Sequence, residues 1–254
     1  MQCISAGGDL RNLLLTISYD GKNFHGWQIQ NNALTVQEVF QNALKKIIGA
    51  DFDIKGCSRT DSGVHANMYC ISLKTTHPIA PERLKSALNR WLPLSVAVLE
   101  CAEVDGDFHA RYSCKSKEYI YKIWNTEVRN PFLDGYALHY RYKIDEKKLH
   151  RAAQAYVGKH DFTSFCTLDS RDKGDLTRTV KAFSVERDGD LVTMRVEADG
   201  FLYNMVRIMV GTLLRVQQGK IPVDGIGEII EKKDRKYAGP TAQPCGLYLN
   251  KVNY

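Results

Sequence analysis

In the first half of the chain, apolar residues recur at the spacings typical of strands and helices in turn. Leu13 to Tyr19 is rich in β-forming residues and stops at Asp20-Gly21, which predicts a strand ending in a turn. Thr35-Val36-Gln37-Glu38 is a capping box, and helical spacing continues from it to Gly49. The remaining predicted elements are strands at about Phe52 to Gly56 and Met68 to Lys74, a helix from Pro81 to Trp91, and a strand from Val96 to Val104.

The second half repeats this order of elements. Its predicted strands are Glu118 to Trp124, with alternating aromatic residues, a hairpin of Thr179 to Arg187 with Leu191 to Ala198 about Asp188-Gly189, and Leu247 to Val252. Its predicted helices are one capped by Asp145, a long apolar one from Phe201 to about Gln218, and a short extra one near Ile226 to Glu231.

Each half therefore reads strand, helix, strand, strand, helix, strand. That order predicts an α+β fold of two ferredoxin-like (βαββαβ) halves, with residues 1–108 in the first and 109–254 in the second. Two antiparallel sheets of this kind, lying side by side, leave a central active-site cleft between their open faces. We expect the N-terminal half to carry the catalytic loop and the C-terminal half to complete the cleft.

Composition and charge narrow the class of protein. The 254 residues are 44% hydrophobic and 25% charged, which is typical of a soluble globular protein with a real core. The formal net charge of +6 mildly favours an anionic partner such as nucleic acid. Four basic residues gather in the sequence between the halves and are candidates for phosphate contacts: Arg111, Lys115, Lys117 and Arg129.

The cysteines and the N-terminal region indicate a cytoplasmic protein. The seven cysteines are odd in number and form no Cys-x-x-Cys pair, so they suggest neither a disulfide framework nor a zinc knuckle. The apolar run Leu13-Leu14-Leu15 is far shorter than the roughly 20 residues of a membrane span.

Candidate chemistry concentrates in Gly56 to Ala66, which brings Arg59, Asp61 and His65 together among small residues that let a ligand approach closely. Composition alone favours a turn in which Asp61 hydrogen-bonds local amides and Arg59 is a solvated charge. Ser62 lacks the Gly-x-Ser-x-Gly context of a hydrolase.

The segment Arg59-Thr60-Asp61-Ser62-Gly63-Val64-His65-Ala66 resembles the active-site signature of the tRNA pseudouridine synthase A family. The resemblance runs in order from Tyr19 to Tyr254, although Ser58 stands where the family usually has Gly and Ser62 where it usually has Ala. The other matching stretches are Tyr19-Asp20-Gly21, Gly26-Trp27-Gln28-x-Gln30, Thr35-Val36-Gln37, Phe108-His109-Ala110-Arg111, Lys117-x-Tyr119-x-Tyr121, Met205-Val206-Arg207 and Gly246-Leu247-Tyr248-Leu249.

The resemblance implies an isomerase that converts uridine to pseudouridine in the anticodon stem-loop of tRNA, at tRNA positions 38, 39 and 40, without metal or organic cofactor. It implies a homodimer. By the same resemblance, Asp61 is the essential carboxylate, acting on the sugar C1′ or assisting elimination there, and Arg207 pairs with it. Arg59 holds the flipped nucleotide, Tyr119 stacks on the uracil, and Leu247 closes the apolar side of the base pocket.

Three other interpretations are open at this stage. One is a non-catalytic RNA-binding protein of tandem ferredoxin-like units, although the Gly-Phe-x-Phe core of the aromatic RNA-recognition signature is missing. Another is a small-molecule enzyme of the same fold, for which we find no Gly-rich phosphate loop or metal-ligand cluster. The last is a related pseudouridine synthase that acts on a different RNA.

Overall fold

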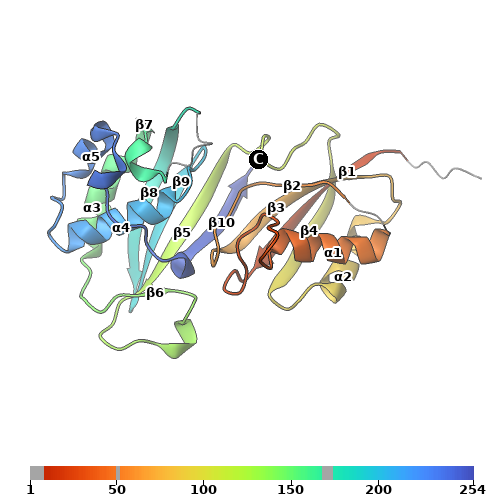
Figure 1. Cartoon of the computed structure of the whole chain (residues 1–254), viewed down its shortest axis with the longest axis horizontal. Helices are drawn as coiled ribbons and strands as arrows, with labels where there is room; N and C mark the ends of the chain where they lie inside the picture. The colour runs from red at the N-terminus through yellow and green to blue at the C-terminus, as the bar shows by residue number, and fades with distance from the viewer. Residues whose placement is uncertain (1–8, 50–51, 168–173) are drawn as a thin grey trace, which may run out of the picture. The chain divides into compact units, whose positions relative to one another are not determined.

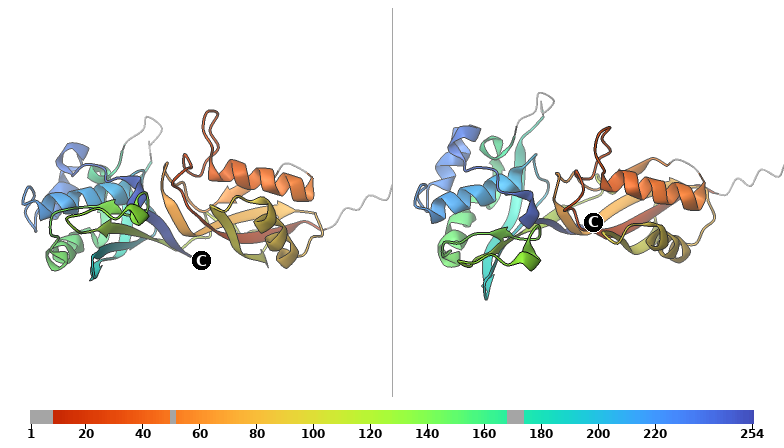
Figure 2. Two further views of the ribbon diagram at one scale, coloured as in Figure 1. Left: turned by 90° about the horizontal axis from the view of Figure 1, so that it is seen from below. Right: turned by 60° about the horizontal axis from the view of Figure 1, so that its bottom comes forward.

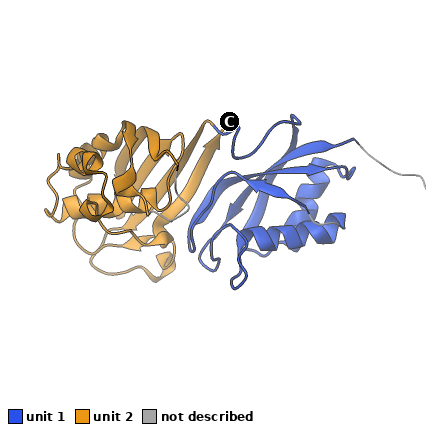
Figure 3. Ribbon diagram, turned by 45° about the horizontal axis from the view of Figure 1, so that its top comes forward, with its two compact units in different colours: residues 1–114, 254 blue, residues 115–253 orange. Residues whose placement is uncertain are grey.

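The computed structural model describes residues 9–49, 52–167 and 174–254, and the chain divides into two compact units (Figure 3). Unit 1 comprises Met1–Cys114 with Tyr254, and unit 2 comprises Lys115–Asn253. The sequence placed the boundary after residue 108, whereas residues 109–114 lie in unit 1. They are held there because the Ala110 N–H donates to Ser72 Oγ (3.1 Å) and the Tyr254 hydroxyl donates to the Ala110 carbonyl (2.8 Å).

Unit 1 has the predicted ferredoxin-like order of elements. Its sheet runs β4-β1-β3-β2, and every neighbouring pair is antiparallel. The differences from the prediction lie at strand ends, where local pattern is least informative. The elements are β1 (Arg11–Tyr19), α1 (Val36–Ile48), β2 (Ile54–Gly56), β3 (His65–Thr75), α2 (Pro81–Trp91) and β4 (Val96–Val104).

The core of unit 1 lies between its sheet and its two helices (Figure 1). Thr35 caps α1 by accepting the Glu38 N–H (3.4 Å), and Gly49 ends it in the left-handed region, at φ 71°. Helices α1 and α2 contact each other, so both cover one face of the sheet. Burying each large apolar side chain of this core contributes roughly 1.5–3 kcal/mol; they include Leu13, Leu15, Ile17, Phe40, Leu44, Ile71, Leu73, Leu84 and Leu88.

Unit 2 repeats the arrangement with additions. Its strands run in the order β10-β5-β9-β8, all antiparallel, which is the order of unit 1; β7 extends this edge beyond β8, and β6 pairs in parallel with β5. The elements are β5 (Ser116–Trp124), β6 (Leu138–His139), α3 (Glu146–Ala153), β7 (Gly158–Asp161), β8 (Thr177–Asp188), β9 (Leu191–Ala198), α4 (Met205–Gln217), α5 (Ile226–Lys232) and β10 (Leu247–Asn253).

Helix α4 is the buried helix of unit 2 and contacts α3 beside the sheet (Figures 1 and 2). The sequence predicted its start at Phe201, which is wrong by four residues: Asn204 has φ 63°, a left-handed conformation that an α-helix does not contain. Within the described ranges, no helix is long and apolar enough to cross a membrane.

Candidate active site

The loop between β2 and β3 of unit 1 carries Arg59 and Asp61, and backbone hydrogen bonds hold it at three points. The Trp27 N–H donates to the Thr60 carbonyl (3.2 Å), and the Gly63 N–H donates to the Phe24 carbonyl (3.1 Å). The Val64 N–H closes a turn by donating to the carbonyl of Asp61 (3.2 Å). The two functional candidates of this unit therefore stand on an ordered backbone.

Gly26 makes the first of these contacts possible. Its φ is 85°, and a Cβ at this position would lie only 2.4 Å from the Thr60 carbonyl oxygen. Any other residue would both strain the backbone and push the loop away. The glycine in the Gly26-Trp27-Gln28 stretch thus fits the loop that carries Asp61.

The side chains of this loop divide into outward-facing and buried ones. Arg59 is exposed and Asp61 is half-buried. His65 is buried at the start of β3, where its Nδ1 lies 3.0 Å from the Gly21 amide, which donates to it, and 3.2 Å from Asp20 Oδ1. Cys57 is also buried, and its Sγ accepts the Cys70 N–H (3.3 Å). His65 and Cys57 therefore have the contacts of structural residues.

The two serines that depart from the family pattern leave the loop intact. The Ser62 hydroxyl donates to the Phe24 carbonyl at 3.4 Å, the same carbonyl that receives the Gly63 N–H. The Ser58 carbonyl accepts a hydrogen bond from the Tyr69 hydroxyl. Both residues are thus accommodated through contacts with neighbouring strands and loops.

In unit 2, Tyr119 and Leu247 lie on one face of the pair β5 and β10. Tyr119 pairs with Leu249 and Tyr121 pairs with Leu247, and residues that pair or lie two apart share a face. The sequence prediction that Tyr119 and Tyr121 point the same way agrees with this register. The Tyr119 ring packs edge-on against Phe201, with ring centroids 5.0 Å apart, and Tyr119 and Leu247 are each only 5% exposed, so this is a largely buried aromatic and aliphatic face.

Arg207, in the first turn of α4, is half-buried and held from two sides. Its Nε donates to the Ala242 carbonyl and its Nη1 to Asn204 Oδ1, each at 2.8 Å. The Ala242 N–H donates back to the Arg207 carbonyl (3.0 Å). These bonds fix the planar guanidinium in one orientation, which a lysine could not reproduce.

The segment that holds Arg207 passes very close to α4 at Gly211. A Cβ on Gly211 would lie 1.7 Å from the Pro240 carbonyl oxygen, so only glycine permits this crossing. The Gly239 N–H donates to the Thr212 hydroxyl (2.8 Å), which fixes the same crossing. Helix α4 therefore carries Arg207 and, through this crossing, also positions the Ala242 carbonyl that accepts from Arg207.

Tyr121 connects Arg207 to the face that bears Tyr119. Its hydroxyl donates to the Gln243 carbonyl (2.7 Å), next to the Ala242 carbonyl that accepts from Arg207. Burial raises the pKa of Tyr121, and the positive charge of Arg207 opposes that rise. Unit 2 thus brings a guanidinium close to an aromatic and aliphatic face.

Asn204 is a functional candidate that the sequence did not indicate. It adopts the left-handed conformation, which costs a non-glycine residue of order 1 kcal/mol or more. Its Oδ1 accepts from Arg207, and its Nδ2 donates to Thr167 Oγ1 (3.1 Å). Asparagine is among the few residues that tolerate this conformation, but nothing in the sequence pattern distinguishes such an asparagine from a residue of the predicted helix.

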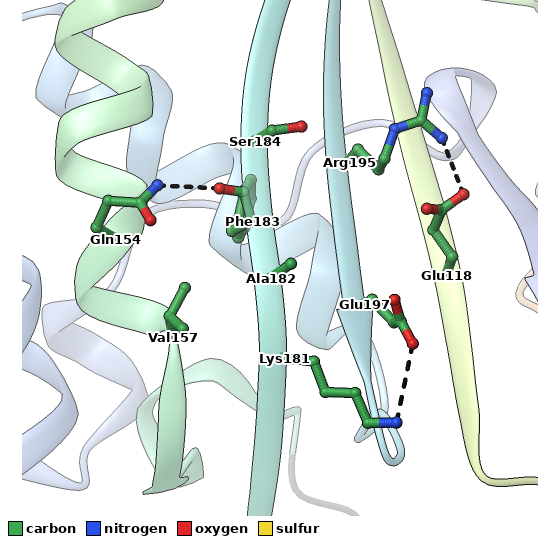
Figure 4. Close-up of a pocket in the computed structure, with 9 residues that line it drawn as sticks. All are labelled: Glu118, Gln154, Val157, Lys181, Ala182, Phe183, Ser184, Arg195 and Glu197. Carbon is green, nitrogen blue, oxygen red and sulfur yellow. Dashed lines mark hydrogen bonds and ion pairs between the residues drawn. The ribbon is translucent and has the colours of Figure 1, made fainter.

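A separate pocket of unit 2, about 240 Å³ in volume, is lined by none of the candidate residues (Figure 4). Its charged side chains pair with one another: Arg195 Nη1 lies 2.8 Å from Glu118 Oε1, and Lys181 Nζ lies 3.8 Å from Glu197 Oε1. Because these charges balance, the pocket offers no excess charge to an anionic ligand.

The candidate residues form two sets with complementary chemistry. Unit 1 supplies a carboxylate, Asp61, and an exposed guanidinium, Arg59, on one loop. Unit 2 supplies an aromatic and aliphatic face with Tyr119 and Leu247, and a fixed guanidinium, Arg207. A planar base could stack on the second set, and a carboxylate such as that of the first can act on a glycosidic carbon.

Comparisons with known proteins identify the family. A family model described as tRNA pseudouridine synthase matches residues 15–113 and 152–254. Proteins named tRNA pseudouridine synthase A from a Thermoanaerobacter species and from Acetivibrio thermocellus are 44% and 45% identical over 245 residues, covering 96% of this chain and 100% of theirs. A Bacillus anthracis protein named tRNA pseudouridine synthase A 2 is 39% identical over 246 residues, with the same coverage. The chain therefore belongs to the tRNA pseudouridine synthase A family.

Proposed function

We propose that this protein converts uridine to pseudouridine in the anticodon stem-loop of tRNA, with Asp61 as the catalytic carboxylate. Membership of the family makes it an isomerase that forms pseudouridine in tRNA. The observation that supports the role of Asp61 is its place in the family signature, half-buried on a loop that the Thr60, Gly63 and Val64 hydrogen bonds hold in one conformation.

The reaction moves the uracil from an N1 to a C5 attachment without changing its mass. The bond between C1′ and N1 breaks, the free base turns, a bond forms between C1′ and C5, the C5 proton leaves, and N1 takes up a proton. Asp61 serves the first step, either by attacking C1′ or by assisting elimination at the sugar.

For the other candidates we propose the roles that the family resemblance implies. Arg207, held in place by Ala242 and Asn204, pairs with Asp61 and orients it. Tyr119 stacks on the uracil and Leu247 closes the apolar side of its pocket. Arg59, exposed beside Asp61, fills the gap that the flipped nucleotide leaves in the RNA.

Release of tritium from C5-labelled uridine in a panel of tRNA transcripts tests this function. We expect release from transcripts with uridine in the anticodon arm, and none when those uridines are replaced by cytidine. Release that is independent of those positions would contradict the proposed substrate position. No release from any tRNA would contradict the activity on tRNA itself.

We expect tRNA binding to weaken steeply with salt, while the choice of uridine changes little. Arg111, Lys115 and Arg129 are exposed, Lys117 is half-exposed, and no ion pair involving them occurs in the described ranges. If the four neutralise four phosphates, log K against log salt has a slope of about −3. Titrations between low and physiological salt measure it, and Lys115→Gln should reduce the slope by about one. A flat affinity would refute a phosphate-dominated footprint.

We further propose that the protein acts in the cytoplasm as a homodimer, with the second subunit supporting the tRNA whose anticodon arm enters the first. Sedimentation at micromolar concentration is expected to show a species of twice the chain mass of 28.8 kDa. A fully active preparation that contains only the 28.8 kDa species would contradict the dimer.

A further inference from the structure

Two buried tyrosine hydroxyls contact the loop that carries Arg59 and Asp61. The Tyr19 hydroxyl lies 2.8 Å from Thr60 Oγ1 and shares a hydrogen bond with it, and this contact is buried. The Tyr69 hydroxyl donates to the carbonyl oxygen of Ser58. Tyr19 is 3% exposed and Tyr69 is fully buried; the Tyr19–Thr60 contact is buried and the Tyr69–Ser58 contact is part-buried.

The two tyrosines stand on the central strands of unit 1. Tyr19 is the last residue of β1 and pairs with Ala66, while Tyr69, in β3, pairs with Ile17 of β1. The register shifts between Ile17 and Tyr19, and the two rings nevertheless lie on the same face of the sheet, with centroids 5.7 Å apart. Strands with neighbours on both sides are the most rigid elements available, so the hydroxyls have fixed positions.

Trp27 packs with the two tyrosines in an aromatic cluster that contacts the loop. Its ring stacks on Tyr69 with centroids 4.2 Å apart, and the ring of Tyr69 lies 5.7 Å from that of Tyr19. The Trp27 N–H also donates to the Thr60 carbonyl. Thr60 is thus held through both its backbone and its side chain, one residue before Asp61.

Each hydroxyl acts on the residue that immediately precedes a functional candidate: Tyr69 holds Ser58, before Arg59, and Tyr19 holds Thr60, before Asp61. We propose that Tyr19 and Tyr69 are positioning residues, whose hydroxyls set the places of Asp61 and Arg59 for the reaction. This inference rests on the roles proposed above for those two residues. It assigns to the hydroxyl groups a task that the aromatic rings, which fill the core, do not perform.

The expected effect is one on turnover and not on affinity. A misplacement of about 1 Å in a reacting group can reduce a rate by 10²-fold. Phenylalanine has nearly the same shape as tyrosine. Tyr19→Phe and Tyr69→Phe therefore keep the aromatic cluster of Tyr19, Tyr69 and Trp27 and remove the hydroxyl that bonds the loop. We expect each change to lower kcat about tenfold at saturating tRNA, with the Kd for tRNA unchanged within about twofold.

The matched control is Tyr254→Phe, also in unit 1. The Tyr254 hydroxyl donates to a backbone carbonyl, that of Ala110 (2.8 Å), and bonds Cys70, which lies outside the loop that carries Arg59 and Asp61. We expect Tyr254→Phe to keep wild-type kcat. A fall in kcat for Tyr254→Phe equal to that of Tyr19→Phe would overturn the inference, because the loss would then follow from removing any tyrosine hydroxyl that bonds a backbone carbonyl of unit 1.

A double-mutant cycle separates anchoring of Thr60 from general destabilisation of unit 1. Thr60→Val removes the partner of the Tyr19 hydroxyl, and Thr60→Ser keeps it. We expect Thr60→Val to lower kcat as much as Tyr19→Phe, the double variant to lose no more than either, and Thr60→Ser to retain most of the rate. All rates are referred to folded protein, with melting temperature measured on the same preparation.

Besides an equal loss in the control, three results would overturn the inference: wild-type kcat in Tyr19→Phe and Tyr69→Phe, multiplicative losses in the double variant, or a loss of tRNA affinity in place of turnover. Failure of the proposed function shows differently. If Asp61→Asn remains active, the role of Asp61 is wrong, whatever the tyrosine variants do. If Asp61→Asn is inactive and both tyrosine variants have full kcat, only the inference about the hydroxyls is wrong.

Discussion

Asp61→Asn is expected to abolish pseudouridine formation in a protein that still folds and binds tRNA. The amide keeps the shape of the carboxylate and removes its charge, so the group that acts at C1′ is lost, and a fall of at least about 10³-fold in rate follows. A turn residue at this position would behave differently. Its replacement would cost at most about 1–2 kcal/mol of stability, and the folded fraction would still turn over.

Tritium release, tRNA affinity and melting temperature, measured on one preparation, separate these outcomes. Asp53→Asn is a suitable control, because Asp53 is an exposed carboxylate of the same unit. The mass of the variant must be checked, since deamidation of the asparagine would restore Asp61. Substantial turnover by folded, undeamidated Asp61→Asn would remove the proposed role of this carboxylate.

Replacing Arg207 by lysine is expected to lower the rate about 10²-fold while the positive charge is kept. Lysine lacks the fixed fork that donates from Nε to the Ala242 carbonyl and from Nη1 to Asn204 Oδ1. The positive charge that we propose to pair with Asp61 would then no longer be held in one orientation by Ala242 and Asn204, and charge-assisted bonds depend on geometry. Single-turnover tritium release at saturating tRNA measures the change.

Arg195→Lys provides the control for the same chemical change in unit 2. Arg195 pairs with Glu118 at 2.8 Å and is 41% exposed, and we expect its substitution to leave the rate unchanged. Wild-type turnover by Arg207→Lys would show that any cation suffices at this position. A loss that merely tracks the folded fraction would assign Arg207 a structural role.

The order of elements in both units could be predicted from the sequence, because strand and helix periods are local signals. The capping box at Thr35 and the stop at Gly49 mark the two ends of α1, and Pro81 marks the start of α2. The strand order of each sheet follows the ferredoxin-like order expected from that sequence of elements. The caps and stops depend on neighbouring residues alone, and the strand order follows from the one arrangement that this order of elements usually adopts.

Features that depend on distant contacts could not be predicted. The two residues of β6 and the four of β7 are too short for a period to appear, and they exist through pairing with β5 and β8. The late start of α4 depends on the left-handed Asn204, whose side chain is held by Arg207 and Thr167. No local pattern contains that information.

The candidate site divides in the same way. The residue types around Asp61 marked its loop as a candidate site, but the role of Asp61, like those of Arg207 and Leu247, was predicted only through the family resemblance. The hydrogen bonds of the Tyr19 and Tyr69 hydroxyls could not be predicted, because the sequence does not distinguish a buried tyrosine in a strand from any other core residue. The residues that hold a site in place contact it across long stretches of sequence, and residue spacing does not predict such contacts.

Tyr254 has a consequence for any attempt to dissect the protein. Its hydroxyl bonds the Ala110 carbonyl, its ring packs 4.8 Å from that of Phe108, and it hydrogen-bonds Cys70, all in unit 1, although the strand leading to it belongs to unit 2. A fragment that ends at Cys114 therefore lacks one of the residues that complete its own fold. Producing the half that carries Asp61 on its own would require the last residue to be supplied in trans or grafted back onto the cut end.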